Sequence, residues 1–301
     1  MSELEDQHTV AGDPAVRRAA LLGAGSGAIA REDTIAPEQE ALVPGLGPSA
    51  SERRKAALFR TAGLATAPVL IVVLAGILWI YYHSLDLANA NRQQRSALDW
   101  STKLWPQTLD IINIAFLSTL LVIVIAVPLG IVLTRPWARR IAPPILAVAN
   151  AGQAVPAYGL LVAFLGIIGQ GTTTVVIALA FYAILPVLRN TMVGLEGVNR
   201  NVIEAGRGMG MTKGLVLLKI EMPLAVPIIV AGVRTAMIIN IGMATLAFLI
   251  GGGGLGITIS SGLKLNQNSV LVVGAVLVAI VALTFDWLGA VAERYLRPRG
   301  I

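Results

Sequence analysis

Long runs of apolar residues, separated by short polar or charged segments, fill most of the chain from residue 63 onward. A helix needs about 20 apolar residues to cross the hydrocarbon core of a bilayer. The uncharged stretch at 141–188 is too long for one crossing, and Gly169, Gln170 and Gly171 divide it into two. The pattern therefore predicts six transmembrane segments, at about residues 63–82, 108–134, 142–168, 173–188, 224–248 and 270–291.

Backbone groups inside lipid must satisfy one another, so each of these segments is expected to be helical. The predicted fold class is an all-α polytopic membrane protein. Composition agrees, because 55% of the 301 residues are hydrophobic and 13% are charged, whereas soluble domains carry about 25% charged residues. The chain has no cysteine and two histidines. We therefore expect no disulfide and no metal site.

The net charge of +6 would fit nucleic acid binding, but in a chain this apolar the positive-inside rule explains it better. The tails and loops that flank the six spans fall alternately on the two sides of the membrane. Those on one side hold 15 Lys and Arg residues, and those on the other side hold 4, namely Arg92, Arg95, Lys103 and Lys264. Both termini are therefore predicted to be cytoplasmic, in a bacterial plasma membrane, with no nucleic-acid partner.

Four regions follow from these boundaries. Residues 1–55 are rich in Ala, Gly, Pro, Glu and Arg without sustained periodicity, which predicts a mostly disordered cytoplasmic tail. Its short apolar patch at 19–30 is an alternative membrane contact. We assign residues 56–107 to the first transmembrane helix and an external loop, 108–293 to the transmembrane core, and 294–301 to a short cytoplasmic C-terminal tail.

The most charged internal loop lies at 191–222, on the predicted cytoplasmic side. Asn201 followed by Glu204 is typical of a capping box, and Gly210 suits a left-handed helix end. Thr212 is expected to cap a second short helix that runs to Ile220, and Pro223 to end that helix or open the next span. Ala205, Gly206 and Gly208 would leave the first helix narrow enough for a partner's groove, with Glu204 as a charge for a basic surface.

The sequence of this loop, EAGRGMGMTKGLVLLKIEMP, resembles the EAA loop of bacterial ATP-binding-cassette importer permeases, where Glu-Ala-Ala is followed by Gly at the seventh place and later by Ile-x-Leu-Pro. Gly206 replaces the second Ala, and Met222 the Leu. Further blocks, PLGIVLTRP, ANAGQAVPAYGLL, LPVLRNTMVGLEGV and AGVRTAMIINIGMATLAFLIGGGGLG, resemble the glycine betaine, carnitine and choline subfamily over residues 100–290. The resemblance implies ATPase coupling through Glu204, Ala205, Gly206, Gly210, Ile220 and Pro223.

The resemblance also implies the rest of the assembly. A five-helix importer-permease (MetI-like) core would form the translocation pathway together with a second permease subunit, identical or paralogous. An ATP-binding-cassette ATPase dimer would grip the loop, and an extracytoplasmic solute-binding protein would deliver the solute. No cofactor would be bound by this chain, since ATP would be used by the partner subunit. Other solutes, such as ergothioneine or an amino-acid derivative, remain an alternative.

Several polar or helix-breaking residues lie inside the predicted spans and are candidates for the translocation path or a gate: Gln153, Pro156, Tyr158, Arg234 and Asn240. A charge at depth faces the bundle interior or a cavity, or else snorkels to the headgroups or pairs with the loop. Interhelical hydrogen bonding is the alternative for Asn240, and is favoured there.

Two other function classes are disfavoured. An ion-coupled transporter would be expected to show intramembrane acidic residues, and the spans between Ile111 and Phe285 contain no convincing buried carboxylate. An intramembrane enzyme would need His, Asp or Ser groupings that the sequence does not offer, so no catalytic residue is predicted.

Overall fold

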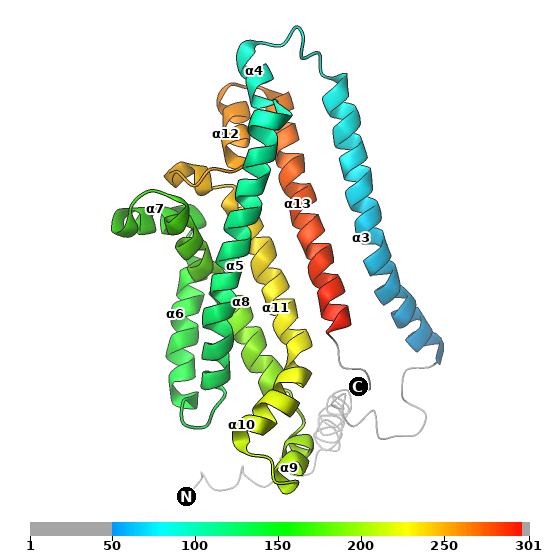
Figure 1. The fold of residues 1–301 in the computed structure, drawn as a ribbon, viewed down its shortest axis with the longest axis vertical. Coiled ribbons are helices and arrows are strands. Elements are labelled where there is room, and N and C mark those ends of the chain that lie inside the picture. The colour runs from blue at the N-terminus through cyan, green and yellow to red at the C-terminus, as the bar shows by residue number, and fades with distance from the viewer. Residues whose placement is uncertain (1–49, 297–301) are drawn as a thin grey trace, which may run out of the picture. The chain divides into compact units, whose positions relative to one another are not determined.

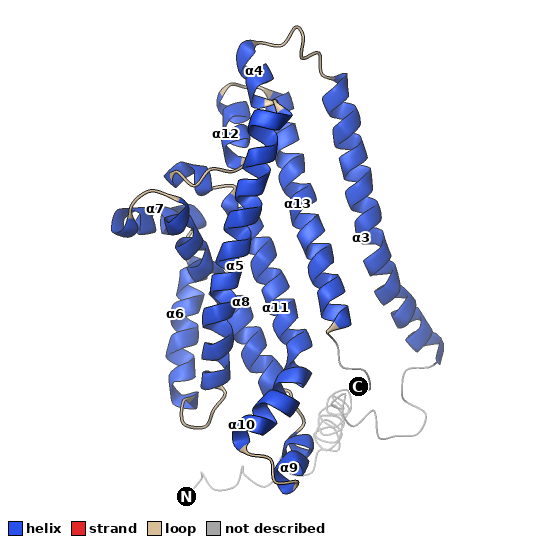
Figure 2. Ribbon diagram, viewed as in Figure 1, coloured by secondary structure: helices blue, strands red, loops and turns tan. Residues whose placement is uncertain are grey.

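The structure, a computed structural model, describes residues 50–296. Contacts divide the chain into two units, Met1–Thr61 and Ala62–Ile301. Within the described residues the chain is helical with connecting loops and contains no strand (Figure 2). Most of the predicted 1–55 tail lies outside the described residues. Residues 50–55, at the end of this predicted mostly disordered tail, form the start of the first described helix.

Among the described residues, five helices are long and apolar enough to cross a membrane. They are α3 (Ala50–Ser84), α5 (Trp105–Leu133), α8 (Thr172–Glu196), α11 (Met222–Ala244) and α13 (Asn268–Tyr295). Shorter elements join them: α4 (Arg92–Ala97), η2 (Trp100–Leu104), η3 (Arg139–Ile141), α9 (Arg200–Gly208), α10 (Lys213–Val216), η4 (Leu217–Glu221), η5 (Ala247–Ile250) and α12 (Gly256–Lys264). α4 and α9 lie at opposite ends of the bundle (Figure 1).

The predicted third span is not one straight helix. It consists of α6 (Ala142–Ala154) and α7 (Ala157–Ile168), which meet at 104°, so that α7 lies across the direction of α6 (Figure 1). The cause is Pro156, which has no amide hydrogen to donate and forces Val155 before it into an extended conformation (ψ 131°). The described helices give six spans if this bent pair counts as one.

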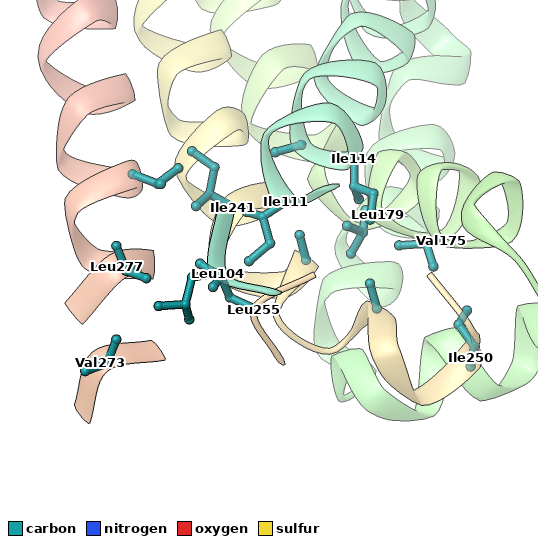
Figure 3. Packing of buried hydrophobic residues seen from close by; sticks show 14 of the residues in the cluster. Leu104, Ile111, Ile114, Val175, Leu179, Ile241, Ile250, Leu255, Val273 and Leu277 are labelled. Carbon is teal, nitrogen blue, oxygen red and sulfur yellow. The ribbon is translucent and has the colours of Figure 1, made fainter. Parts of the chain in front are cut away.

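The bundle core at the α4 end is built by residues from η2, α5, α8, α11, η5 and α13 (Figure 3). In this cluster Ile111 of α5 lies near Ile241 of α11, and Ile114 of α5 lies near Leu179 of α8 (Figure 3). A second cluster nearer the α9 end is rich in alanine, and its buried members include Ala126, Ala149, Ala180, Ala183 and Ala236. Small side chains let membrane helices approach closely, where packing replaces the hydrophobic driving force.

Glycines set the closest approaches between α5, α8 and α11. A Cβ added to Gly130 of α5 would lie 2.7 Å from the Thr191 side chain of α8, and one added to Gly194 of α8 would lie 3.1 Å from the Ala225 carbonyl of α11. At Gly130 and Gly194 the helix backbone therefore lies directly against the neighbouring helix, and neither position has room for a larger residue.

Candidate functional site

The predicted loop helix exists as α9, at the end of the bundle opposite α4 (Figure 1). Its cap is Asn199, whose side chain accepts a hydrogen bond from the Asn201 amide at 2.9 Å. The prediction that Asn201 caps the helix is therefore wrong, because the helix begins one residue before it, at Arg200.

The other end of α9 is closed as the sequence predicts. Gly210 adopts a left-handed conformation (φ +85°). Its amide donates to the Arg207 carbonyl at 2.9 Å, and the Met211 amide donates to the Gly206 carbonyl at 3.2 Å. This pair of bonds is the Schellman motif, and glycine adopts the required left-handed conformation without a Cβ penalty.

The second predicted short helix is not separate from the next span. Thr212 caps α10, its hydroxyl accepting from the Leu215 amide at 3.4 Å. α10 then continues through the π-helical turn η4 into α11, with the Met222 amide donating to the Leu217 carbonyl. Pro223 opens α11. Because proline lacks an amide hydrogen and its ring crowds the preceding turn, the wider π turn ahead of it lets the helix run on without a break.

Two residues of the predicted motif pack against each other. Gly206 is buried, and a Cβ at this position would come 2.5 Å from the Ile220 side-chain end, 3.6 Å from the Met211 sulfur and 3.7 Å from Val216. Gly206 therefore faces η4 and not outward, so it does not narrow the helix for a partner as predicted. Glycine in place of alanine at this position lets α9 pack more closely against Ile220.

Around the buried Gly206, other residues of α9 carry exposed side chains. Glu204 and Ala205 are exposed, as are Val202 (44% exposed) and Met209 (73% exposed). Val202, Ala205 and Met209 follow the i, i+3, i+7 spacing of one helix face, which is the spacing of anchors in helix-in-groove recognition. Exposed apolar side chains next to a charge, on a loop beyond the spans, are typical of a protein interface.

A polar cleft of about 400 Å³ lies under α9. Its lining carries seven charged residues, namely Arg135, Arg139, Glu196, Arg200, Glu204, Arg207 and Glu221. Glu221 is buried and pairs with Arg135 at 2.6 Å. This pair was not predicted from the sequence, in which Arg135 stands as one of the basic residues that flank the spans. Glu221 is an acidic residue at the start of an apolar span, two residues before Pro223, and a charge in that place indicates that a basic partner should be sought.

Three of the predicted path residues lie around the bend between α6 and α7. The Gln153 side-chain amide donates to the Tyr182 carbonyl of α8 at 3.0 Å, which fixes it against that helix. Pro156 stands at the break itself. Tyr158, on the first turn of α7, is 55% exposed. Their assignment to a translocation path stays a prediction.

The fourth path candidate, Arg234 of α11, is ion-paired within the bundle. It donates to both carboxylate oxygens of Asp286 on α13, at 2.6 and 2.8 Å, and lies 3.7 Å from Glu293. Asp286 lies inside the predicted sixth span, directly after Phe285, and was not among the predicted site residues. Asp286 is a partly exposed carboxylate within α13, one residue beyond the range for which no buried carboxylate was expected.

The last candidate, Asn240 of α11, is fully buried. Its side-chain nitrogen donates to the Thr119 hydroxyl of α5 at 3.0 Å, and that hydroxyl donates to the Met237 sulfur at 3.2 Å. The Asn240 side-chain oxygen has no partner among the described residues. This arrangement agrees with the interhelical hydrogen bond that the sequence analysis favoured at this position.

Known proteins match the chain in sequence and in fold. The family described as the binding-protein-dependent transport system inner membrane component matches residues 126–299. The choline transport system permease protein OpuBB of Bacillus subtilis is 45% identical over 195 residues, which cover 65% of this chain and 89% of that protein. The glycine betaine/carnitine/choline transport system permease protein OpuCB of the same organism is 44% identical over 188 residues, covering 62% and 86%.

A relative from another organism and a solved structure agree. The carnitine transport permease protein OpuCB of Listeria monocytogenes is 40% identical over 195 residues, covering 65% of this chain and 88% of that one. A chain of the MetNI methionine ABC transporter, solved in inward-facing conformations, superposes with a TM-score of 0.58 at 23% identity, covering 65% of this chain and 96% of that one. At that identity the match shows a shared fold, which is the predicted MetI-like one.

Proposed function

Because the chain belongs to the family of binding-protein-dependent transport system inner membrane components, we propose that it is the permease subunit of an ATP-binding-cassette importer for osmoprotectants. The solutes would be quaternary ammonium compounds such as glycine betaine, carnitine or choline. The observation that carries this substrate class is the 40–45% identity to three permeases named for those solutes.

The partners follow from the same premise and from the exposed face of α9. We propose that an ATPase dimer on the cytoplasmic side receives this face in a groove, with Val202, Ala205 and Met209 as apolar contacts and Glu204 as the charged one. A second permease subunit would complete the pathway, and a binding protein would deliver solute at the α4 end. ATP would be bound and hydrolysed by the partner, since the role of this chain is transport.

This arrangement places the α9 end of the bundle in the cytoplasm, in agreement with the Lys and Arg bias of the sequence. The absence of native cysteine makes the orientation directly measurable. In Met209→Cys, a membrane-impermeant maleimide is expected to label inside-out vesicles and to leave right-side-out vesicles unlabelled. Labelling of right-side-out vesicles alone would place α9 outside the cell and refute the docking proposal.

Docking is tested by charge reversal at Glu204, which has no ion pair among the described residues. Glu204→Lys, expressed with the cognate ATPase, is expected to insert normally but to lower the co-purified ATPase roughly tenfold or more, as for an interface hot spot. Arg92→Glu, a charge reversal on an exposed residue at the α4 end, is the matched control and should co-purify like the wild type. Unchanged association in Glu204→Lys would contradict the proposed role of α9.

A further inference from the structure

The ion pair between Arg135 and Glu221 joins two segments that are 86 residues apart in the sequence. The terminal nitrogens of Arg135 lie 2.6 and 3.4 Å from the two carboxylate oxygens, and its Nε donates to the Ile131 carbonyl at 3.2 Å. The Glu221 side chain is only 6% exposed. A carboxylate so deeply buried is costly unless it is paired, so the position of Glu221 is tied to that of Arg135.

The two residues stand where separate elements meet. Arg135 follows the end of α5 by two residues, and Glu221 is the last residue of η4, next to the first residue of α11. Ile220, the neighbour of Glu221, is the residue on which Gly206 of α9 packs. A continuous set of contacts therefore runs from α9 through Ile220 to Glu221, and from Glu221 through Arg135 to α5.

Beyond this ion pair, glycines bring α5, α8 and α11 into close contact. Gly130, five residues before Arg135, sits against Thr191 of α8, and Gly194 of α8 sits against Ala225, four residues after Glu221. Closely packed interiors transmit strain because they have little free volume. The start of α11 is thus in contact with α5 through the ion pair and with α8 through the Gly194 contact.

We infer that Arg135 and Glu221 are positioning residues that transmit the movement of α9 to α5, so that ATP hydrolysis by the partner is coupled to movement of the spans. This inference rests on the proposed function. Neither residue belongs to the exposed face of α9, so the pair acts after docking, by holding the start of α11 to the end of α5. Removal of the ion pair leaves the exposed face of α9 intact, so the ATPase still binds and hydrolyses ATP, but less solute is imported for each ATP hydrolysed.

The other charges of the cleft do not substitute for the pair. Arg139, Arg200 and Arg207 are exposed and have no ion pair among the described residues, and Glu196 and Glu204 on the same cleft are likewise exposed. Arg140, which is exposed and does not line the cleft, is a matched control for loss of one arginine charge near α5.

The test uses the assembled transporter in proteoliposomes and measures ATP hydrolysed per solute imported. In Arg135→Gln/Glu221→Gln no charge is left buried, so the complex is expected to assemble and hydrolyse ATP. Its ratio of hydrolysis to uptake should rise about tenfold, the size of a typical coupling between sites. The charge-swapped Arg135→Glu/Glu221→Arg should restore most of the coupling, and Arg140→Gln should match the wild type.

Three results would overturn the inference: an unchanged ratio in the double glutamine variant, loss of ATPase association in that variant, or a charge swap that assembles without restoring coupling. Failure of the proposed function is seen separately, because it would leave the wild-type complex itself without ATP-dependent uptake. The wild type is therefore measured first, and the variants are compared with it.

Discussion

Arg234 of α11 and Asp286 of α13 form a two-point ion pair, with nitrogen–oxygen distances of 2.6 and 2.8 Å, inside the part of the bundle that spans the membrane. Gly289, one turn from Asp286, makes room for it, since a Cβ there would lie 2.9 Å from the Arg234 side chain. A charged arginine is energetically costly inside a membrane span, and here Asp286 neutralises the charge of Arg234. The ion pair therefore links α11 to α13.

We predict that Asp286→Asn lowers the stability of the purified protein by about 1–3 kcal/mol, because it removes hydrogen bonds between charged groups. Glu293→Gln should have a smaller effect, since Glu293 is the more distant partner at 3.7 Å. Thermal unfolding in detergent measures both. Equal losses in the two variants would contradict the assignment of Asp286 as the main partner.

The glycine contacts give a second prediction within one helix. Gly232→Ala is expected to destabilise by roughly 1–3 kcal/mol through overpacking, because its Cβ would lie 2.7 Å from Asn190 and 2.9 Å from the Pro186 carbonyl. Gly242→Ala, also in α11, meets nothing within 4 Å. It should be neutral or stabilising, by up to about 1 kcal/mol from helix propensity. Urea or thermal titration compares the pair, and the opposite order would refute the proposed packing of α8 on α11.

The bend between α6 and α7 gives a third prediction, which tests the proposed path. A single cysteine at Tyr158, which is exposed, should react with a water-soluble maleimide at least several times faster than one at Gln153, which is held against α8. Faster labelling at Gln153, or none at Tyr158, would remove Tyr158 from a water-accessible path.

A fourth prediction concerns Asn240. Because its buried nitrogen bonds Thr119 across α5 and α11, Asn240→Ala should lower stability by about 0.6 kcal/mol, the average for such interhelical bonds in membranes. Thr119→Ala should cost a similar amount, and the double variant little more than either. Additive losses in this double-mutant cycle would show that the two side chains do not interact.

The sequence located the long helices because each is an apolar run bounded by charge or glycine, and that pattern depends on the bilayer alone. It also identified Gly210 and Thr212 as helix-end residues, because capping depends on a few neighbouring residues. The bend at Pro156 was missed as a boundary, although proline is a strong signal, because hydropathy alone does not distinguish a straight span from a broken one.

The tertiary pairs could not be predicted in the same way. Arg135 with Glu221 and Arg234 with Asp286 are separated by 86 and 52 residues, so nothing local links their members. The inward orientation of Gly206 is similar, because it depends on where Ile220 lies after the chain has turned at Gly210. One unpaired-looking charge inside a span is the signal that a distant partner should be sought.

We propose that ATP hydrolysis by a partner ATPase drives transport through its contact with α9. Solute uptake into proteoliposomes tests this most directly. The chain is reconstituted with its ATPase, and radiolabelled choline or glycine betaine is supplied with the binding protein. We predict uptake that requires ATP hydrolysis and the ATPase, and that is lost in Glu204→Lys. Equal uptake by the chain alone, without ATPase or nucleotide, would contradict the account.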